Sequence, residues 1–380
     1  MTPAWAGHRD IPAILQPSRM ALSSRRYAFV ATGDVARNAS FVRLRELGRH
    51  LAVRGLEIHY FLDDESATAS QVAPTLDFAT VHLAGGASRR ARLWERRRRL
   101  AETAPAAVHI LNPQPGNCGT VAALPMPLIC DWDELLSARN RTFLQRRLDL
   151  LCEFYAQRKA SIHVVASLWL QAHLKQHFGI DSLYLPYAAY LPALPDGPCP
   201  FQEPTAVYMG NLMPDFDHDL LIDAWELLKR RGDTPLRLSI VGGGPLLEAV
   251  KSDVVSRRLD NVTVEGYLTG QPLWDRIRHA RVLLFPIRDT IGNRSRCPSK
   301  TFAYMQAKRP IITNRVGEVA EALGDLATYI SPDPVAFADA VARLPLKPLP
   351  DVAYPLHVHQ WGTRAQALLD RLETIPGFDI

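Results

Sequence analysis

The stretch VLLFPIRDTIGNRSRCPSKTFAYMQAKRPIITN, residues 282–314, decides the fold of this chain. It begins and ends with a short apolar run, and a basic loop and a helix-forming segment lie between them. Pro298 and Ser299 indicate where the helix begins, because proline and hydroxyl residues are favoured at helix N-termini. The pattern is therefore strand, loop, helix and strand, which is one unit of a parallel α/β sheet.

The start of this helix is a candidate phosphate site. The unpaired N–H groups and the positive end of the helix dipole favour an anion at a helix N-terminus. Arg294, Arg296 and Lys300 add full positive charges close to that end, beside the hydroxyls of Ser299 and Thr301. These residues predict a diphosphate site. A solvated basic loop in an ordinary strand–helix–strand unit is the alternative interpretation.

The length and composition are typical of a soluble globular protein with two domains. The chain has 380 residues, of which 47% are hydrophobic and 22% are charged. No apolar run reaches the roughly 18 residues that a membrane span needs. Residues 1–24 lack the apolar core of a signal peptide, and we expect them to form a loosely ordered extension. The five cysteines are scattered without a CxxC pair, which argues against a disulfide framework or a zinc site and is consistent with a reducing cytoplasm.

The segment SRRARLWERRRRL, residues 88–100, concentrates positive charge on one expected helix. It holds seven arginines and one glutamate, and apolar side chains are interleaved with them. Such a surface suits anionic lipid headgroups, so residues 89–99 are a candidate contact with an anionic membrane surface. A solvated helix is the alternative. No nucleic-acid-binding motif accompanies the arginines, and no nucleic-acid partner is expected.

The first half of the chain begins with a β-α-β unit. Residues 27–32 are an expected strand, residues 41–54 show helical apolar spacing, and residues 56–62 are a second expected strand. The loop that holds Gly33 follows the first strand, at the edge of the sheet where ligands usually bind. The loop lacks G-x-G-x-x-G spacing, so a dinucleotide fingerprint is absent.

Asp131 and Asp133 follow an expected strand at residues 128–130, which predicts carboxylates at the mouth of the sheet. Such a pair can hold a divalent metal that bridges a nucleotide diphosphate. It can also supply a base or a hydrogen-bond acceptor for a sugar hydroxyl, and the residues favour this role over a metal. An N-capped helix is the structural alternative.

A proline-dense segment at residues 186–204 indicates a domain boundary. A second α/β pattern follows it. Its third element, a strand at residues 236–241, leads into Gly242 and Gly243, where backbone can approach a ligand closely. The expected organisation is an extension at 1–24, a first domain at 25–190 joined by a C-terminal helix at 357–380, a linker at 191–204 and a second domain at 205–356.

The order of several short motifs makes the second half specific. They are Met209-Gly210, IVGGGP at 240–245, NVTVEG at 261–266, VLLFP at 282–286, PSKTFAYM at 298–305 and RPIIT at 309–313. Six pieces in this order resemble the nucleotide-sugar half of GT-B glycosyltransferases, especially family 4, the glycosyl transferases group 1. The resemblance covers about residues 206–343, and the first domain resembles the family only in outline.

The resemblance implies an α/β GT-B fold, with two Rossmann-like parallel-sheet domains that face each other across a cleft. A nucleotide diphosphate-sugar would bind the second domain and a glycan or lipid-linked acceptor the first, with no metal and no cofactor. The catalytic candidates are Asp131 and Asp133. The candidate donor-binding residues are Gly33, Gly242, Gly243, Gly266, Tyr267, Leu268, Arg294, Arg296, Ser299, Lys300 and Thr301.

The chain departs from the family at two sets of positions. Ser295 and Ala303 stand where the family commonly has two glutamates, of which the second usually receives the ribose hydroxyls of the nucleotide. Phe216 and Asp217 stand where the family commonly has an arginine and a lysine. These departures motivate one alternative, a non-catalytic GT-B homologue that acts as a partner or sugar-binding subunit.

The leading hypothesis is a hexosyltransferase-like enzyme of class EC 2.4 that builds a polysaccharide or glycoconjugate. The resemblance favours retention of the anomeric configuration without a protein nucleophile. An inverting enzyme would need a base, for which Asp133 or Asp131 is the candidate. We expect a cytoplasmic protein, peripheral on the inner membrane face. A metal-dependent enzyme that uses both aspartates and a GT-B epimerase are further alternatives.

Overall fold

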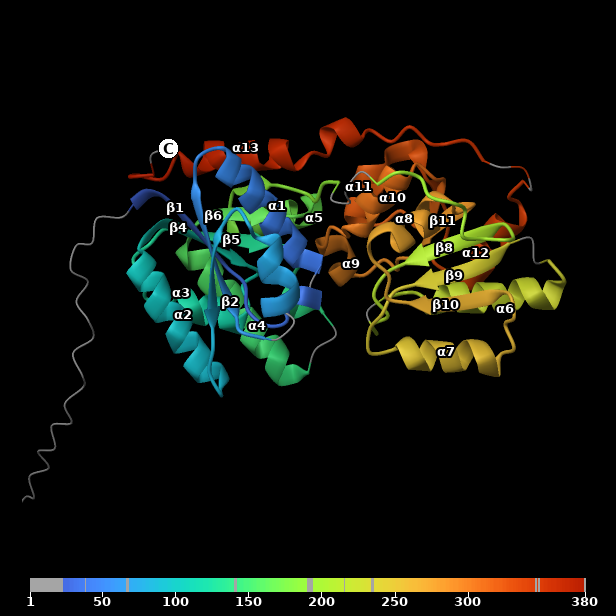
Figure 1. The fold of residues 1–380 in the computed structure, drawn as a ribbon, viewed down its shortest axis with the longest axis horizontal. Coiled ribbons are helices and arrows are strands. Elements are labelled where there is room, and N and C mark those ends of the chain that lie inside the picture. The colour runs from blue at the N-terminus through green and yellow to red at the C-terminus, as the bar shows by residue number, and fades with distance from the viewer. Residues whose placement is uncertain are drawn as a thin grey trace, which may run out of the picture.

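The structure is a computed structural model with two lobes side by side, each built on one parallel sheet (Figure 1). The prediction of two parallel α/β sheets is confirmed. None of the described helices has the length and apolar content that a bilayer crossing requires. The described residues are 23–37, 39–65, 68–139, 142–189, 194–214, 216–233, 236–345, 347 and 349–378.

The first sheet has the strand order β3-β2-β1-β4-β5-β6-β7, and every neighbouring pair is parallel. The strand order reverses between β1 and β4, which opens a crevice beyond the carboxyl ends of these strands. The strands are β1 Ser23–Val30, β2 Glu57–Asp63, β3 Thr80–Ala84, β4 Pro105–Leu111, β5 Leu128–Trp132, β6 Ala160–Val165 and β7 Ser182–Tyr184.

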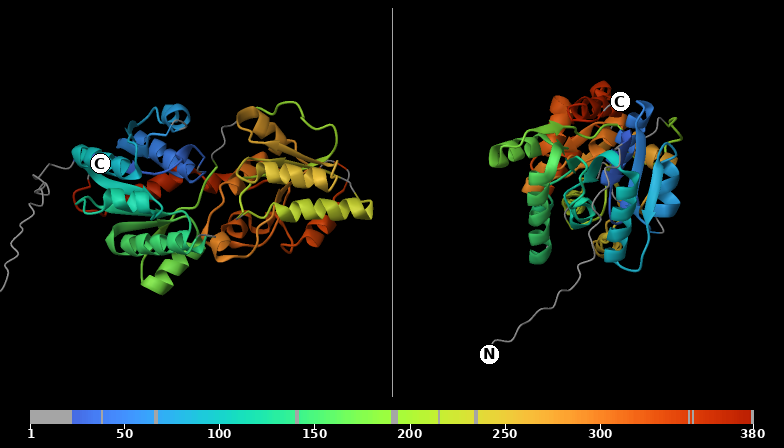
Figure 2. Two further views of the ribbon diagram at one scale, coloured as in Figure 1. Left: turned by 90° about the horizontal axis from the view of Figure 1, so that it is seen from below. Right: turned by 90° about the vertical axis from the view of Figure 1, so that its left-hand side faces the viewer.

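Helices cover both faces of the first sheet because alternate strand residues point to opposite sides. Tyr27 and Phe29 of β1 pack with α1 and α13, whereas Ala28 and Val30 pack on the side of α2 to α5 (Figure 2). The helices are α1 Ala39–Val53, α2 Arg89–Thr103, α3 Pro115–Val121, α4 Phe143–Lys159, α5 Leu168–Phe178 and α13 Trp361–Leu372, with short turns η1 Val35–Arg37, η2 Thr68–Val72, η3 Ala73–Thr75 and η4 Leu136–Ala138.

The second sheet has the order β10-β9-β8-β11-β12-β13, with its reversal between β8 and β11. Its strands are β8 Thr205–Met209, β9 Arg237–Val241, β10 Val262–Gly266, β11 Val282–Phe285, β12 Ile311–Thr313 and β13 Thr328–Tyr329. Its helices are α6 Asp219–Arg231, α7 Leu247–Ser256, α8 Gly270–Arg278, α9 Ile291–Ser295, α10 Lys300–Ala307, α11 Gly317–Leu323 and α12 Pro334–Ala342, with turns η5 Gly324–Leu326 and η6 Leu356–Val358.

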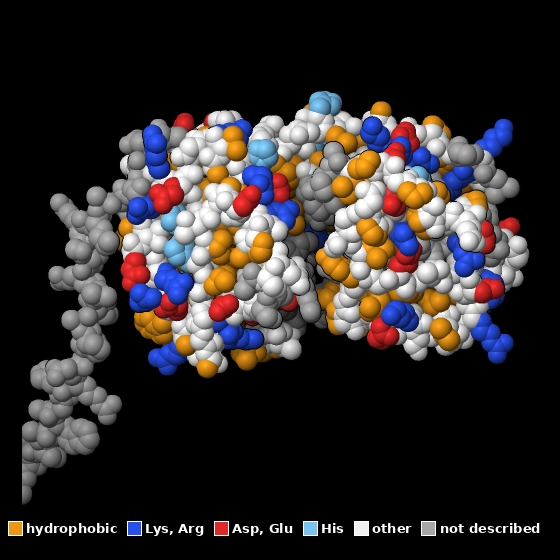
Figure 3. All heavy atoms as spheres, viewed as in Figure 1, with side chains coloured by type: hydrophobic (Ala, Val, Ile, Leu, Met, Phe, Trp, Pro, Cys, Tyr) orange, Lys and Arg blue, Asp and Glu red, His pale blue; other side chains and the backbone are white. Residues whose placement is uncertain are grey.

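One continuous apolar core joins the two lobes. The same cluster of buried side chains contains Phe302 of α10, Trp361 of α13 and Tyr187 of the segment after β7. The rings of Tyr187 and Trp361 lie 5.9 Å apart. Helix α13 packs against α1 of the first lobe (Figure 1), and the guanidinium of Arg54 donates to the carbonyl of Gly362 at 3.0 Å. The space-filling view shows the two lobes meeting along a groove (Figure 3).

Several expected elements appear with shifted limits. The strand expected at 128–130 continues to Trp132, because Asp131 and Trp132 pair with β6. Residues 1–22 of the expected extension lie outside the described residues, and Ser23 and Ser24 belong to β1. The division into domains stays a prediction.

Candidate functional site

A buried lysine lies at the start of α10, on the face of the second lobe that borders the groove. The Nζ atom of Lys300 lies 4.2 Å from the centre of the Phe285 ring and 4.4 Å from that of Tyr208. It also donates to the Tyr208 hydroxyl at 3.4 Å. The Phe216 ring is 5.7 Å away. Aromatic faces stabilise a cation, but they do not neutralise it.

The charge of Lys300 is costly in this position. Burial, together with the nearby charge of Arg296, lowers the pKa of Lys300 to about 7. No carboxylate among the described residues forms an ion pair with either cation, although Asp217 is close enough to oppose the shift. A bound anion would offset this cost, since opposite charge within a few ångström favours the protonated lysine.

Arg296 is the second member of this cationic pair. Its guanidinium lies 4.5 Å from the centre of the Phe216 ring, and its buried Nε has no hydrogen-bond partner among the described residues. Burial lowers the pKa of Arg296, which stays charged at any physiological pH. Buried N–H groups are normally satisfied, so this donor is suited to an acceptor on a ligand.

Only some residues of the predicted basic loop lie beside Lys300 and Arg296. Ser299 is the N-cap residue of α10, and Thr301 is buried with a hydroxyl that has no described partner. Arg294, two residues before Arg296, instead lies at the surface, where its Nη2 donates to Asp289 at 2.7 Å. The hydrogen bond with Asp289 raises the pKa of Arg294 and already compensates its charge.

The glycines of the second lobe bring backbone close to Lys300. A Cβ at Gly210 would lie 2.8 Å from Nζ of Lys300, and a Cβ at Gly242 would lie 1.8 Å from the carbonyl oxygen of Gly210. Gly243 accepts from the backbone N–H of Leu212 at 2.8 Å. Any side chain at Gly210 or Gly242 would therefore displace the lysine or the strand end that faces it.

The residues after β10 flank the same strand ends. Gly266 accepts from the N–H of Gly242 at 2.8 Å, which ties the two loops together. Tyr267 is 72% exposed, and Leu268 is half-buried beside it. Both stay candidates for contact with a nucleotide base. Gly33 lies across the groove on the first lobe, where its N–H donates to Asp63 at 2.8 Å.

Asp131 lies beneath the groove rather than at its mouth. It is fully buried within β5, where Arg43 donates to Oδ2 at 2.7 Å and His109 Nε2 lies 3.3 Å from the same oxygen. Burial alone would raise the pKa of Asp131, but the charge of Arg43 and the contact with His109 outweigh it and lower the pKa. This geometry suits a positioning role, because the carboxylate is enclosed and paired.

Asp133 follows the end of β5 and is the more accessible carboxylate of the two. Ser40 donates to Oδ2, and the backbone N–H of Asp133 donates to the side chain of Asn112 at 2.8 Å. Burial raises the pKa of Asp133 to about 6, and the neighbouring charge of Glu134 contributes to the shift. Oδ1 is buried without a described partner. A carboxylate with such a pKa can exchange a proton near neutral pH.

Contacts between the lobes set Asp133 and the cationic pair on opposite sides of one groove. The N–H of Leu135 donates to Ser295 Oγ at 3.2 Å, and Ser167 donates to the carbonyl of Ser295 at 2.7 Å. The charge of Glu134 acts on the pKa of Arg296, so the first lobe approaches the start of α10 directly.

A protein-family model and several solved structures are similar to this chain. Residues 203–345 match the family model described as glycosyl transferases group 1. The resemblance derived from the six ordered motifs is thereby confirmed for this part of the chain. No curated protein matches it at a significant level.

Solved structures of glycosyltransferases share the fold over nearly the whole length. HepE from Anabaena, in complex with UDP and glucose, is 12% identical with a TM-score of 0.72, over 92% of this chain and 100% of that one. WaaG, involved in lipopolysaccharide biosynthesis, is 14% identical with a TM-score of 0.64, over 93% and 96%. The outer core galactosyltransferase WaaB is 13% identical with a TM-score of 0.59, over 93% and 97%.

The two departures of this chain from the family pattern have distinct surroundings. Ser295 bonds to the first lobe through its hydroxyl and carbonyl, so it acts in the contact between lobes. Ala303 is fully buried inside α10. Phe216 lies under both cations, where the family commonly has positive charge. The sequence did not identify Tyr208, Phe216 and Phe285 as a cluster, because they come from three separate segments.

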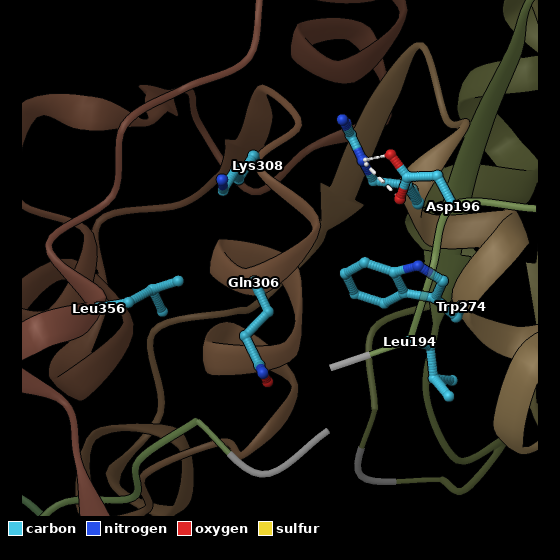
Figure 4. Close-up of a pocket in the computed structure, with 7 residues that line it drawn as sticks. Leu194, Asp196, Trp274, Gln306, Lys308 and Leu356 are labelled. Atoms are coloured by element: carbon cyan, nitrogen blue, oxygen red, sulfur yellow. Dashed lines mark hydrogen bonds and ion pairs between the residues drawn. The ribbon is translucent and has the colours of Figure 1, made fainter. Parts of the chain in front are cut away.

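A separate cavity of about 270 Å³ lies on the second lobe of the protein (Figure 4). Asp196 and Arg278 form an ion pair at one side of it, at 3.1 Å, and the indole of Trp274 lies below them. Its lining contains none of the predicted site residues. Within the described residues, no group of three or more His, Cys, Asp or Glu side chains is arranged to hold a metal ion.

Proposed function

We propose that this protein moves a sugar from a nucleotide diphosphate-sugar to a glycan or lipid-linked acceptor. The observation that carries the proposal is the pair of buried cations, Lys300 and Arg296, which lack a carboxylate partner among the described residues. A diphosphate supplies two or more negative charges and several acceptor oxygens. The titles of the HepE structures, which include UDP and UDP-glucose, support a uridine nucleotide as the donor.

The cationic pair would act on the departure of the nucleotide diphosphate. Negative charge develops on the leaving oxygen as the glycosidic bond breaks, and preorganised positive charge stabilises it. Lys300 and Arg296 are held by aromatic rings before the donor arrives, so little reorganisation is needed. The proposed chemistry is metal-independent and retaining, with the diphosphate leaving into this site and the acceptor hydroxyl approaching from the same face.

Asp133 is the proposed contact with the acceptor hydroxyl. Its Oδ1 has no described partner, whereas Ser40 and Asn112 fix the rest of the residue. The raised pKa of about 6 leaves the carboxylate mostly ionised at pH 7, so it can accept a hydrogen bond from the acceptor hydroxyl and orient it. The proposed cellular place is the cytoplasmic face of a membrane, where a lipid-linked acceptor would be met.

A non-catalytic GT-B homologue is the second candidate function. The residue that supports this function is Ala303, because its buried methyl group cannot accept hydrogen bonds from the ribose hydroxyls. Such a protein would bind nucleotides weakly and would leave any donor intact. Nucleotide binding and donor consumption therefore separate the two functions.

Calorimetric titration with UDP, GDP, ADP and dTDP, each in magnesium and in EDTA, tests the proposal. We expect one nucleotide to bind with an affinity that EDTA does not change. Arg296→Gln should weaken that affinity about tenfold to hundredfold, because a charge-assisted hydrogen bond contributes roughly 1.5 to 3 kcal/mol. Arg294→Gln is the matched control, since this arginine is two residues away and already paired.

Two results would contradict the proposal. Absence of binding by all four nucleotides would favour the non-catalytic homologue. Equal losses for Arg296→Gln and Arg294→Gln would remove the buried site and assign the effect to general positive charge.

A further inference from the structure

Helix α4 presents its apolar side to solvent. Phe143 is 75% exposed, Leu144 69% and Leu151 65%. The described residues include sixteen exposed large apolar side chains, and six of them lie on this one helix. Those six are Phe143, Leu144, Leu148, Leu150, Leu151 and Phe154. The apolar side of α4 therefore faces away from the core.

The polar side of α4 is the side that faces the protein. Its buried residues are Asp149, Glu153 and Ala156. The carboxylate of Glu153 accepts from the backbone N–H of Ser137 at 2.9 Å and from the Ser137 hydroxyl at 2.8 Å. Breaking these hydrogen bonds would leave a buried carboxylate unpaired at a high cost in free energy. The helix therefore cannot rotate to bury its apolar side. The orientation of α4 is therefore fixed by polar contacts.

Positive charge lies among the exposed apolar side chains. The guanidinium of Arg147 lies 5.0 Å from the centre of the Phe143 ring, and that of Arg158 lies 4.4 Å from that of Phe154. Arg146 and Lys159 are also exposed. Within the described residues, none of these four cations is ion-paired. The outer side of α4 thus combines aromatic and leucine side chains with unpaired cations.

The neighbouring helix α2 extends this surface. Helix α3 packs between α2 and α4, and the charge of Arg97 acts on the pKa of Tyr155, so the two helices share one side of the lobe. Trp94 is 56% exposed, with the Arg97 guanidinium 5.3 Å from its ring centre. In Figure 2, α4 lies along the outer edge of the first lobe.

Most of the arginines on α2 are already paired, which changes the expectation for residues 89–99. Arg96 is buried and ion-paired with Asp63, so it is not part of a solvated basic face. Arg92 lies 3.5 Å from the same carboxylate, and Arg98 and Arg99 pair with Glu95. The apolar side chains of a membrane-contacting surface must therefore come from α4, and Trp94 lies at the border of that surface.

We propose that α4 is an interfacial helix that docks the protein onto an anionic lipid bilayer. Aromatic and leucine side chains enter the boundary between headgroups and acyl chains, and arginine side chains reach back to headgroup phosphates. Cations near an anionic surface strengthen such binding. A second copy of the chain is a poorer occupant, because two such helices face to face would bring the same cations together.

Docking at α4 would hold the groove close to the bilayer. Phe143 follows Asp133 by ten residues, and Glu153 bonds to Ser137 in the turn between them. A lipid-linked acceptor could then reach Asp133 without leaving the membrane. This consequence rests on the proposed function, whereas the docking itself does not.

Co-sedimentation of the full chain with vesicles of phosphatidylglycerol and phosphatidylethanolamine tests the proposal. We expect the triple variant Phe143→Gln, Leu144→Gln, Leu151→Gln to lower the partition coefficient at least tenfold. The matched control replaces three exposed valines on other helices, Val53→Gln, Val255→Gln and Val335→Gln, and should bind as the wild type does. Phosphatidylcholine vesicles should bind the wild type more weakly than the anionic ones.

The outcomes separate docking from donor chemistry. Equal partition of the α4 variant and the control would overturn the proposal, as would a wild-type protein that does not bind the anionic vesicles. A wild-type dimer in sedimentation velocity that the α4 variant makes monomeric, without vesicle binding, would assign the helix to self-association instead. Nucleotide affinity of the α4 variant, measured by calorimetry, should equal that of the wild type and reports on the donor site alone.

Discussion

Donor affinity should depend on the protonation of Lys300. The pKa of this lysine is about 7 in the unliganded protein, because burial and the charge of Arg296 disfavour the ammonium. A diphosphate binds the charged form, so affinity is complete below pH 7 and falls as pH rises above it. Arg296 keeps its charge throughout this range and supplies a constant part of the affinity.

The size of the effect follows from that pKa. One unit above it, at pH 8, about one molecule in ten carries the charged lysine. The dissociation constant at pH 8 should therefore be about tenfold larger than at pH 6, which corresponds to about 1.4 kcal/mol. Binding at pH 8 should also take up close to one proton, as the bound diphosphate restores the charge of Lys300.

The assay is calorimetry with UDP-glucose at pH 6, 7 and 8, in buffers of different ionisation enthalpy. The intact sugar nucleotide is the right probe, because a terminal phosphate such as that of free UDP itself titrates with a pKa of about 6. Lys300→Met is the control and should bind weakly with no pH dependence. Equal wild-type affinity at pH 6 and pH 8, without proton uptake, would show that donor binding does not depend on the protonation of Lys300.

Two further variants test the carboxylates of the first lobe. Asp133→Asn should lower kcat by about a hundredfold while donor affinity survives, since misplacing the acceptor hydroxyl by about 1 Å costs roughly that much. Wild-type kcat should rise with pH through about 6, the pKa of Asp133, and a variant with wild-type turnover would exclude the residue from the mechanism. Asp131→Asn should reduce the free energy of unfolding in urea by about 3 to 5 kcal/mol, because it leaves the buried charge of Arg43 unpaired. Unchanged stability would show that this ion pair has no structural role.

The segment 282–314 predicted the strand and the start of the long helix correctly, because these depend on local composition and spacing, but the expected loop between them contains the short helix α9. The structure has β11 at Val282–Phe285 and a helix that begins at Lys300. The ordered motifs also predicted the family, since glycines and prolines mark turns that a fold needs at given positions. Local rules carry this information without reference to distant residues.

Only the tertiary structure distinguishes residues of the same type that lie close together in the sequence. Arg294 and Arg296 stand two residues apart in one loop, yet one pairs with Asp289 at the surface and the other lies buried against Phe216. Asp131 and Asp133 likewise differ, because β5 continues to Trp132. Asp131 therefore lies inside the strand, whereas Asp133 follows its end. Pairing with β6 sets that limit, and no local pattern reports it.

The sequence was sufficient to predict the two-sheet α/β fold, the family match of residues 203–345 and the start of helix α10. The tertiary structure alone decided the aromatic cluster around Lys300, where Tyr208 and Phe285 come from adjacent strands β8 and β11 that are far apart in sequence. It also decided that α4 turns its apolar side outward, through the bonds from Ser137 to Glu153. Periodicity shows that a helix has two unlike sides, but only the contacts of its neighbours determine which side faces water.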